Sequence, residues 1–155
     1  MIITKDLIDQ AYKLTGPLAK AVIADPAANW GPRWVRVKVG VPGLVESFFF
    51  KFGKETGWDP KWGEKIDFKD IAIAKFRLVE RERKNASEIV LLKPWLVHKG
   101  EYLYAGGAHR DGITVAVSGL HSWADEAISE IFISIIVMLA RLKADNLVKQ
   151  GKELI

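Results

Sequence analysis

The sequence predicts an α+β fold in which one antiparallel sheet is flanked by helices and the longest helix is carboxy-terminal. Two hairpin patterns support this prediction, because β-prone runs flank the turns at residues 41–43 and 110–112. Residues 123–149 add a long apolar segment with helical spacing. The resulting order of helix, hairpin, helix, hairpin and helix is typical of one sheet covered by helices.

The chain is expected to form a single domain over residues 1–155. Its length is close to that of one domain, and 49% hydrophobic residues are enough to form a buried core. It contains no cysteine, which excludes disulfides, thiolate metal sites and a cysteine nucleophile. The stability of the fold therefore has to come from packing.

The net charge of the chain and its hydropathy pattern limit the kinds of molecule that we expect it to bind. Twenty-three Lys+Arg against 19 Asp+Glu give a net charge of +4, which suits an anionic ligand or nucleic acid. The densest charged run, residues 80–84, alternates in sign as a solvated helix face does, so we expect no nucleic-acid partner. The apolar run 131–140 is much shorter than the roughly 20 residues of a membrane span, so we expect no membrane partner. Because residues 1–10 lack the layout of a secretory signal, we predict a cytoplasmic protein.

The first predicted element is helical. Residues 4–24 carry apolar side chains at helical spacing, with Thr4 as a candidate N-cap. Gly16 and Pro17 interrupt this pattern, and proline removes a helix hydrogen bond. We therefore expect two helices that meet at these residues.

A hairpin is predicted next. Residues 33–39 alternate apolar side chains with Arg36 and Lys38, which indicates a strand with one solvated face. Residues 44–52 are rich in Phe and Val and form the predicted returning strand. A polar loop follows at 53–65.

The second half repeats the alternation of helix and hairpin. Residues 68–84 are a predicted helix, and 87–97, interrupted by Pro94, are either a short helix or an extended segment. Residues 100–108 and 113–118 are predicted strands around the Asp-Gly turn. The last helix follows.

That last helix, predicted over residues 123–149, is hydrophobic nearly all round. One apolar stripe consists of Ile128, Ile131, Phe132, Ile135, Leu139 and Leu142, and further apolar residues on other faces are Ile133, Ile136 and Val137. Such a helix is buried on more than one side. It is either enclosed in the core of a monomer or covered by a second subunit, and we expect a homo-oligomer with Ile136 on the intersubunit face.

One stretch of the sequence resembles a known family. Residues 104–120 read Tyr-Ala-Gly-Gly-Ala-His-Arg-Asp-Gly-Ile-Thr-Val-Ala-Val-Ser-Gly-Leu, and an acidic pair follows at 125–126. This pattern resembles the signature of the haem-degrading domain family, which includes glycolate-utilisation G-like proteins, haem-binding sensors and an uncharacterised branch. The resemblance extends to residues 71–75 on the preceding helix, although Phe76 stands where the family has alanine, and to the loop 57–62.

The resemblance implies a profilin-like sheet-and-helix fold and a ring-like or higher homo-oligomer. It also suggests haem as a cofactor. Some members of the family place a haem-binding histidine in the amino-terminal half, but that half of this chain contains no histidine. The resemblance therefore supports the prediction of the fold more directly than it supports a prediction of haem ligation.

Two glycine-containing pairs are candidate ligand contacts. Gly106 and Gly107 allow the backbone to approach a ligand or a neighbouring helix closely, or they form a bulge or turn. Ser118 and Gly119 lie where a strand meets the last helix, so their N–H groups are candidate donors to a carboxylate, with helix capping as the alternative. Both pairs are assigned to the ligand site.

Charged and aromatic side chains complete the candidate site. His109 follows the glycine pair, next to Arg110, which is suited to bidentate binding of a carboxylate. Lys75 leaves an apolar helix face and either contacts a ligand or extends along the helix to solvent. Trp58 and Trp62 cover either a flat ligand, a neighbouring subunit or the core.

No metal site is expected, because His121 and Asp125 are two ligands at helical spacing without a third. The sequence contains no nucleophile triad, phosphate loop or dinucleotide fingerprint. The first hypothesis is an oligomeric protein that binds haem, another tetrapyrrole or an anionic carboxylate. The second is an enzyme or enzyme accessory in which Lys75 or His109 acts on a small carboxylate. The third is a structural assembly protein whose last helix is its functional surface.

Overall fold

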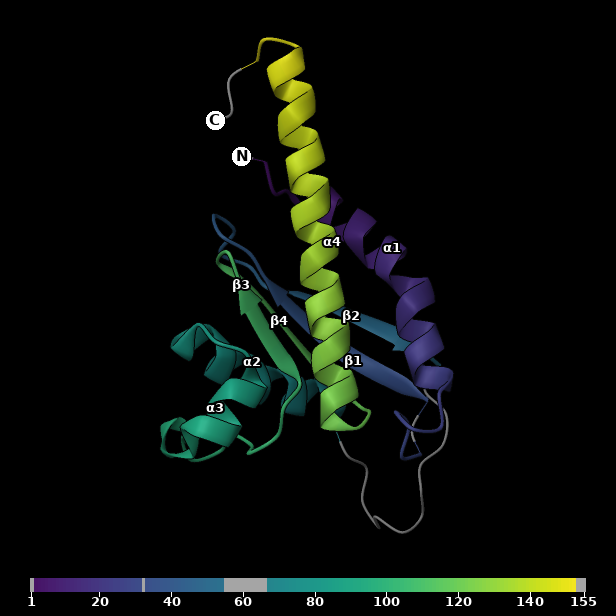
Figure 1. The fold of residues 1–155 in the computed structure, drawn as a ribbon, viewed down its shortest axis with the longest axis vertical. Coiled ribbons are helices and arrows are strands. Elements are labelled where there is room, and N and C mark those ends of the chain that lie inside the picture. Colours follow the sequence, from purple (N-terminus) through teal and green to yellow (C-terminus); the bar gives the residue numbers. More distant parts are fainter. Residues whose placement is uncertain (1, 32, 55–66, 153–155) are drawn as a thin grey trace.

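The computed structural model describes residues 2–31, 33–54 and 67–152 and shows the predicted α+β fold (Figure 1). Its elements are α1 (Lys5–Ala24), β1 (Trp34–Gly40), β2 (Phe48–Gly53), α2 (Phe68–Glu82), α3 (Ala86–Leu92), the 3-10 turn η2 (Pro94–Leu96), β3 (Gly107–Arg110), β4 (Ile113–Ser118) and α4 (Ser122–Lys149). The predictions of an antiparallel sheet, of flanking helices and of a long carboxy-terminal helix are confirmed.

The described strands form one antiparallel sheet in the order β2-β1-β4-β3. The two hairpins therefore join through their inner strands, with Val37 of β1 opposite Val117 of β4. Each outer strand has a side chain bonded to its backbone. The Tyr12 hydroxyl donates to the Lys51 carbonyl of β2, and the His109 N–H of β3 donates to Asn85 Oδ1 over 3.0 Å.

Helices cover both faces of this sheet. α1 and α4 lie side by side on one face, and α2, followed by α3, lies on the other (Figure 1). Side chains alternate between the two faces along a strand, so Val35, Val37 and Val39 of β1 enter the core beneath α1 and α4. The main core consists of these valines together with apolar residues of α1, α4, β2 and β4, including Ile8, Ala11, Phe52, Val115, Val117, Ile128, Phe132, Ile133 and Ile136.

The predicted break at Gly16 and Pro17 is wrong, since α1 continues through both residues. Pro17 is exposed, whereas the buried face of the helix continues past it from Ala11 to Ala19. Packing of this continuous face against α4 and β2 outweighs the hydrogen bond that proline removes.

The predicted solvated face of β1 is also wrong. Arg36 and Lys38 are half-buried, because α2 packs across this face of the sheet. Lys38 Nζ lies 4.2 Å from the centroid of the Phe76 ring on α2. The polar alternation along β1 therefore marks the face that contacts a helix through long cationic side chains.

The segment before β3 differs from the predicted strand 100–108, because pairing begins only at Gly107. Residues 97–106, here called the strap, instead cross from η2 to the sheet. The Arg81 guanidinium holds the strap by donating to both carboxylate oxygens of Glu101, at 2.9 and 3.0 Å, and to the Leu96 carbonyl at 2.9 Å. These side-chain bonds take the place of the strand pairing that the sequence predicts.

The predicted Asp-Gly hairpin and the predicted last helix are both present. Asp111 and Gly112 have φ values of 53° and 79°, as the turn between β3 and β4 requires. In α4 the expectation for Ile136 is wrong, since its side chain is fully buried within this chain. Contacts with α1, β3 and β4 bury a wide arc of the helix, which accounts for much of its all-round hydrophobicity. Among the described helices, none combines the length and apolar content that crossing a membrane requires.

The junction of β4 and α4 yields the first prediction. Gly119 has φ 147°, and a Cβ at this position would lie 2.4 Å from the Trp34 carbonyl oxygen. Gly119→Ala should therefore lower the free energy of unfolding by about 2 kcal/mol or more. Gly16→Ala is the matched control, because Gly16 lies within a helix with nothing within 4 Å of the added carbon, and it should raise stability by about 0.5–1 kcal/mol. Urea unfolding measures both, and equal effects would contradict the prediction.

Candidate functional site

A buried ion pair lies where α2, α4 and the end of β4 meet. Lys75 Nζ of α2 is 3.1 Å from Asp125 Oδ2 of α4, and the two side chains are 4% and 1% exposed. Lys75 Nζ also donates to the Val117 carbonyl over 3.1 Å. The ammonium therefore connects a helix on each side of the sheet with the central hairpin.

The carboxylate of this pair accepts further hydrogen bonds. The Leu120 N–H donates to Asp125 Oδ1 over 2.9 Å, and the Gly119 N–H also contributes. Burial raises the pKa of Asp125 to about 6, while the Lys75 ammonium and these N–H groups oppose that rise. At pH 7 the pair is therefore an ammonium and a carboxylate, both of which are hydrogen-bonded.

Gly106 and Gly107 lie at this junction, where neighbouring atoms leave no room for a side chain. A Cβ on Gly106 would lie 2.5 Å from Lys75 Nζ and 2.9 Å from the Val117 carbonyl oxygen, and one on Gly107 would lie 2.6 Å from Val79 Cγ2. The Gly106 carbonyl accepts hydrogen bonds from the Val117 N–H and from the Ser129 hydroxyl. Of the alternatives raised by the sequence, the structure shows close approach of the backbone to a neighbouring helix.

A pocket of about 350 Å³ opens beside the ion pair and is here called the Lys75 pocket. Its lining residues are Trp30, Phe68, Ile71, Lys75, Tyr104, Ser118, Gly119, Leu120, His121, Ser122 and Asp125. Trp30 and Phe68 meet edge to face, with ring centroids 6.3 Å apart. The pocket therefore has an aromatic wall on one side and the start of α4 on the other.

His121 is the N-cap residue of α4 and makes no side-chain capping bond. The sequence offered helix capping as the alternative role of Ser118, but in the described part of the chain no side chain caps the helix, and Asp125 accepts a hydrogen bond from the Leu120 N–H that precedes it. First-turn N–H groups that lack a capping side chain carry partial positive charge. This end of α4 forms part of the pocket wall.

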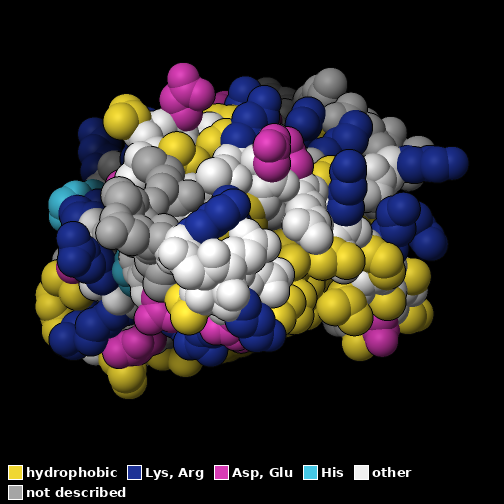
Figure 2. Space-filling view, turned by 90° about the horizontal axis from the view of Figure 1, so that it is seen from above, with side chains coloured by type: hydrophobic (Ala, Val, Ile, Leu, Met, Phe, Trp, Pro, Cys, Tyr) yellow, Lys and Arg dark blue, Asp and Glu magenta, His cyan; other side chains and the backbone are white. Residues whose placement is uncertain are grey.

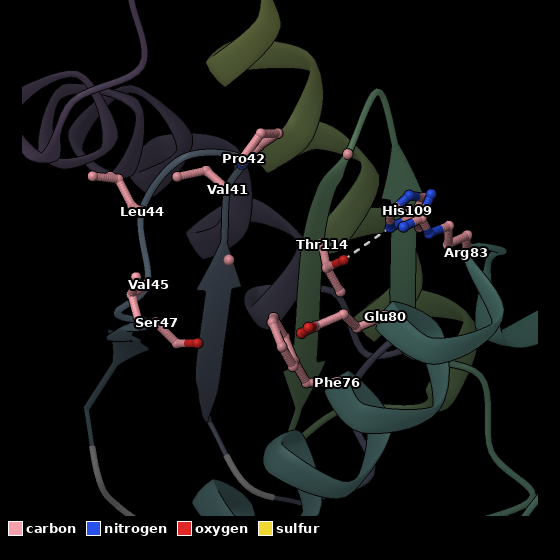
Figure 3. A pocket seen from close by; sticks show the side chains of 12 residues that line it. Val41, Pro42, Leu44, Val45, Ser47, Phe76, Glu80, Arg83, His109 and Thr114 are labelled. Atoms are coloured by element: carbon pink, nitrogen blue, oxygen red, sulfur yellow. Dashed lines mark hydrogen bonds between the residues drawn. The ribbon is translucent and has the colours of Figure 1, made fainter. Parts of the chain in front are cut away.

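His109 lies in a second concavity of about 380 Å³, here called the His109 pocket (Figure 3). Its ring Nδ1 is 2.9 Å from the Thr114 hydroxyl, and its backbone N–H is bonded to Asn85. Burial, followed by the nearby Arg83 guanidinium, lowers the pKa of His109, so the ring is neutral at pH 7. The lining residues are Gly40, Val41, Pro42, Leu44, Val45, Ser47, Phe76, Glu80, Arg83, His109, Gly112 and Thr114.

The predicted site residues are thus divided between separate places. Lys75, Ser118 and Gly119 line one pocket, whereas His109 lines the other. Thr114, the partner of His109, is four residues from Ser118 along β4, which corresponds to about 13 Å in an extended strand. Arg110, next to His109 on β3, points to the opposite face and donates to the Ser134 hydroxyl of α4 over 3.2 Å.

Other expectations concern the loop tryptophans and metal ligands. Trp58 and Trp62 lie outside the described residues. Within residues 2–31, 33–54 and 67–152, no group of three or more His, Asp or Glu side chains is arranged to hold a metal ion. The sequence reading missed the aromatic residues Trp30, Phe68 and Tyr104 as pocket lining. From the sequence, Asp125 is only one residue of an acidic pair and a metal-ligand candidate without a third partner. An amine on an apolar helix face is nevertheless a signal that a buried carboxylate has to pair with it.

Comparisons of the chain with protein-family models, with curated proteins and with solved structures gave no match. The geometry of the two pockets is therefore the basis for any functional conclusion.

The second prediction concerns the ion pair. Lys75→Met should lower the free energy of unfolding at pH 8 by about 3–5 kcal/mol, because it leaves the Asp125 carboxylate buried without its cation. Because the folded-state pKa of Asp125 is already raised to about 6, the stability that its carboxyl group contributes is present at low pH and is lost as the pH rises through that value. The loss caused by Lys75→Met should therefore be smaller at pH 5, where a proton neutralises the unpaired carboxylate.

Denaturant unfolding at the two pH values measures this difference. Lys13→Met, which removes an exposed lysine of α1, is the control and should change stability by less than about 0.5 kcal/mol at either pH. A loss of stability that is identical at pH 5 and pH 8 would refute the assignment of the pair.

Proposed function

We propose that the protein binds a small anionic molecule with an apolar ring system in the Lys75 pocket. The observation that supports this most directly is that one concavity is lined both by aromatic side chains and by the start of α4, which no described side chain caps. Pockets for small molecules are typically apolar concavities of this kind with a few polar groups at fixed positions. The first hypothesis from the sequence, an oligomeric protein that binds an anionic ligand, names the same class of ligand.

The apolar part of the ligand is assigned to the aromatic wall. Trp30, Phe68, Ile71 and Tyr104 surround this side of the pocket, and Tyr104 is 58% exposed. A planar ligand placed against these side chains would remove apolar surface from water, which stabilises the complex by about 25 cal/mol for each Å² buried. Exposed aromatic surface in a concavity favours a ring over a flexible chain.

The anionic part is assigned to the start of α4. Its first-turn N–H groups and the hydroxyls of Ser118 and Ser122 are suitable donors to a carboxylate. The charge of Lys75 is already balanced by Asp125, so this lysine is an electrostatic support of the pocket floor. The same balance argues against Lys75 as a general base, because a base needs a free amine.

Haem and other tetrapyrroles belong to this ligand class, and the resemblance to the haem-degrading domain family supports including them. The chain provides one imidazole at the Lys75 pocket, that of His121, and N–H donors suited to a propionate. His109, which the sequence assigns to the ligand site, lies in the other pocket with Nδ1 bonded to Thr114. If haem were bound here, His121 would be the histidine available to coordinate its iron.

The third prediction tests this site with naphthalene-1-carboxylate and haemin as probes. Naphthalene-1-carboxylate should bind with a micromolar dissociation constant, and the uncharged carboxamide at least about tenfold more weakly. Ile71→Trp, which fills the pocket, should abolish binding, whereas Leu91→Trp on the exposed face of α3 should not. Calorimetry measures each affinity.

Haemin distinguishes the tetrapyrrole from smaller ligands. If haem binds in this pocket, the Soret maximum of haemin should shift when the wild-type protein is added. With His121→Ala the maximum should return to the position of free haemin. Binding of the carboxylate alone would restrict the ligand class to small aromatic acids. The absence of binding by both probes, or binding unaffected by Ile71→Trp, would overturn the proposal.

The proposed oligomer is supported by the outer face of α1 and α4. Leu14, Leu18, Trp123, Met138 and Leu142 are each between 45% and 60% exposed on these neighbouring helices. Figure 2 shows hydrophobic side chains gathered on the side of the molecule that the two helices form. Large contiguous apolar patches mark interaction sites, and a stable interface needs about 800 Å² from each partner. We infer that a second copy of the chain covers this face.

The fourth prediction follows from that assignment. In light scattering, wild type should have a multiple of the 17.4 kDa chain mass, and Leu18→Glu with Met138→Glu should shift the mass to 17.4 kDa. Leu91→Glu, at a residue that is 64% exposed on α3, is the control and should leave the mass unchanged. A wild-type monomer at micromolar concentration would contradict the proposal.

A further inference from the structure

The His109 pocket lies apart from the Lys75 pocket, on the same face of the sheet but toward the opposite end of β4. Its walls come from α2, from β3 and β4, and from the turn that follows β1 (Figure 3). The two pockets share no lining residue. A ligand of the His109 pocket is therefore independent of the function proposed above.

Two opposite charges lie one turn apart at this pocket. Glu80 and Arg83 are both exposed near the end of α2. Within the described part of the chain, neither side chain has an ion-pair or hydrogen-bond partner. Both charges act on His109, since the Arg83 guanidinium lowers its pKa and the Glu80 carboxylate raises it. A cation and an anion thus border the same concavity, and Lys38 is a second cation near the Glu80 carboxylate, since burial lowers the pKa of that lysine and this carboxylate opposes the effect.

The backbone at Arg83 places its side chain at the edge of the pocket. Arg83 ends α2 in the left-handed conformation, with φ 54°, and its N–H donates to the Val79 carbonyl over 2.8 Å. This cap fixes the backbone from which the guanidinium extends. A planar guanidinium is suited to bidentate binding of a carboxylate.

His109 adds a fixed polar group between the sheet and α2. Thr114, whose side chain is buried, holds the ring through Nδ1, and Asn85 holds the backbone N–H. Of the two ring nitrogens, Nε2 is the one that this contact with Thr114 does not use. In Figure 3, His109 and Thr114 lie across the pocket from Pro42 and Leu44.

Apolar side chains form the rest of the pocket. Val41, Pro42 and Leu44 lie on one side, and the Phe76 ring lies beneath Glu80 (Figure 3). The pocket therefore combines a cation, an anion and an apolar wall within about 380 Å³. This combination matches a small zwitterion with an apolar side chain.

We propose that the His109 pocket binds an apolar α-amino acid. Its carboxylate pairs with the Arg83 guanidinium, its ammonium group pairs with the Glu80 carboxylate, and its side chain packs against Val41, Pro42 and Leu44. A bidentate contact between arginine and the carboxylate fixes the orientation of the ligand. The Glu80 carboxylate discriminates against simple carboxylic acids, because it would be left beside their uncompensated negative charge.

The fifth prediction uses L-leucine as the probe, with 4-methylpentanoate and 3-methylbutan-1-amine as analogues that each lack one charged group. Calorimetry should detect leucine binding, and both analogues should bind at least about tenfold more weakly. Amide chemical shifts should move at Arg83, His109 and Thr114. Glu80→Gln and Arg83→Gln should each weaken leucine binding by a similar factor.

Arg77→Gln is the matched control, because Arg77 is an exposed arginine of α2 that does not line the pocket. It should leave the affinity for leucine unchanged. Three results would each overturn the proposal. They are the lack of leucine binding at about 10 mM, equal binding of either analogue, and chemical shift changes at residues 118–122 that replace those expected at Arg83, His109 and Thr114. The last outcome would place leucine in the Lys75 pocket and would leave the function proposed there intact.

Discussion

The arrangement of the chain around β4 depends on neutralising one buried ammonium. A charge removed from water costs several kcal/mol unless a counter-charge and hydrogen bonds replace its hydration. Lys75 meets this requirement through Asp125 and the Val117 carbonyl, which belong to α4 and β4. The start of α4, the end of β4 and the middle of α2 are therefore held to one point, and glycine is needed at Gly106 because Lys75 Nζ occupies the space of a side chain.

This junction also separates the two pockets. α2 crosses the sheet over β1, β4 and β3, and the pockets open at opposite ends of the helix, beside Phe68 at its start and beside Arg83 just beyond its last turn. One end has aromatic side chains and the N-terminal end of α4, whereas the other has two charges of opposite sign and a neutral imidazole. The same face of the sheet therefore borders two pockets whose lining residues differ in chemistry.

The sequence predicts the elements of this fold more accurately than it predicts their relations in space. Helical spacing and the Asp111-Gly112 turn are local signals, so both hairpins and the long helices are present, although residues 4–24 form one helix where two are predicted and the third strand begins only at Gly107. The covered face of β1 depends on α2, which lies more than 25 positions away along the chain, so Lys38 looks solvated in the sequence but contacts Phe76. The sequence places Lys75 and His109 in one candidate site. In the structure the two residues line different pockets, which lie toward opposite ends of β4.

The bonds that Tyr12 and Asn85 make to the outer strands have a consequence for aggregation. An unpaired strand edge is a template on which another chain can add a strand, and such addition leads to open-ended fibres. The Tyr12 hydroxyl occupies a carbonyl of β2, and the Asn85 amide occupies an N–H of β3. An incoming strand would have to displace a side chain at either edge, so growth of the sheet from molecule to molecule is opposed on both sides.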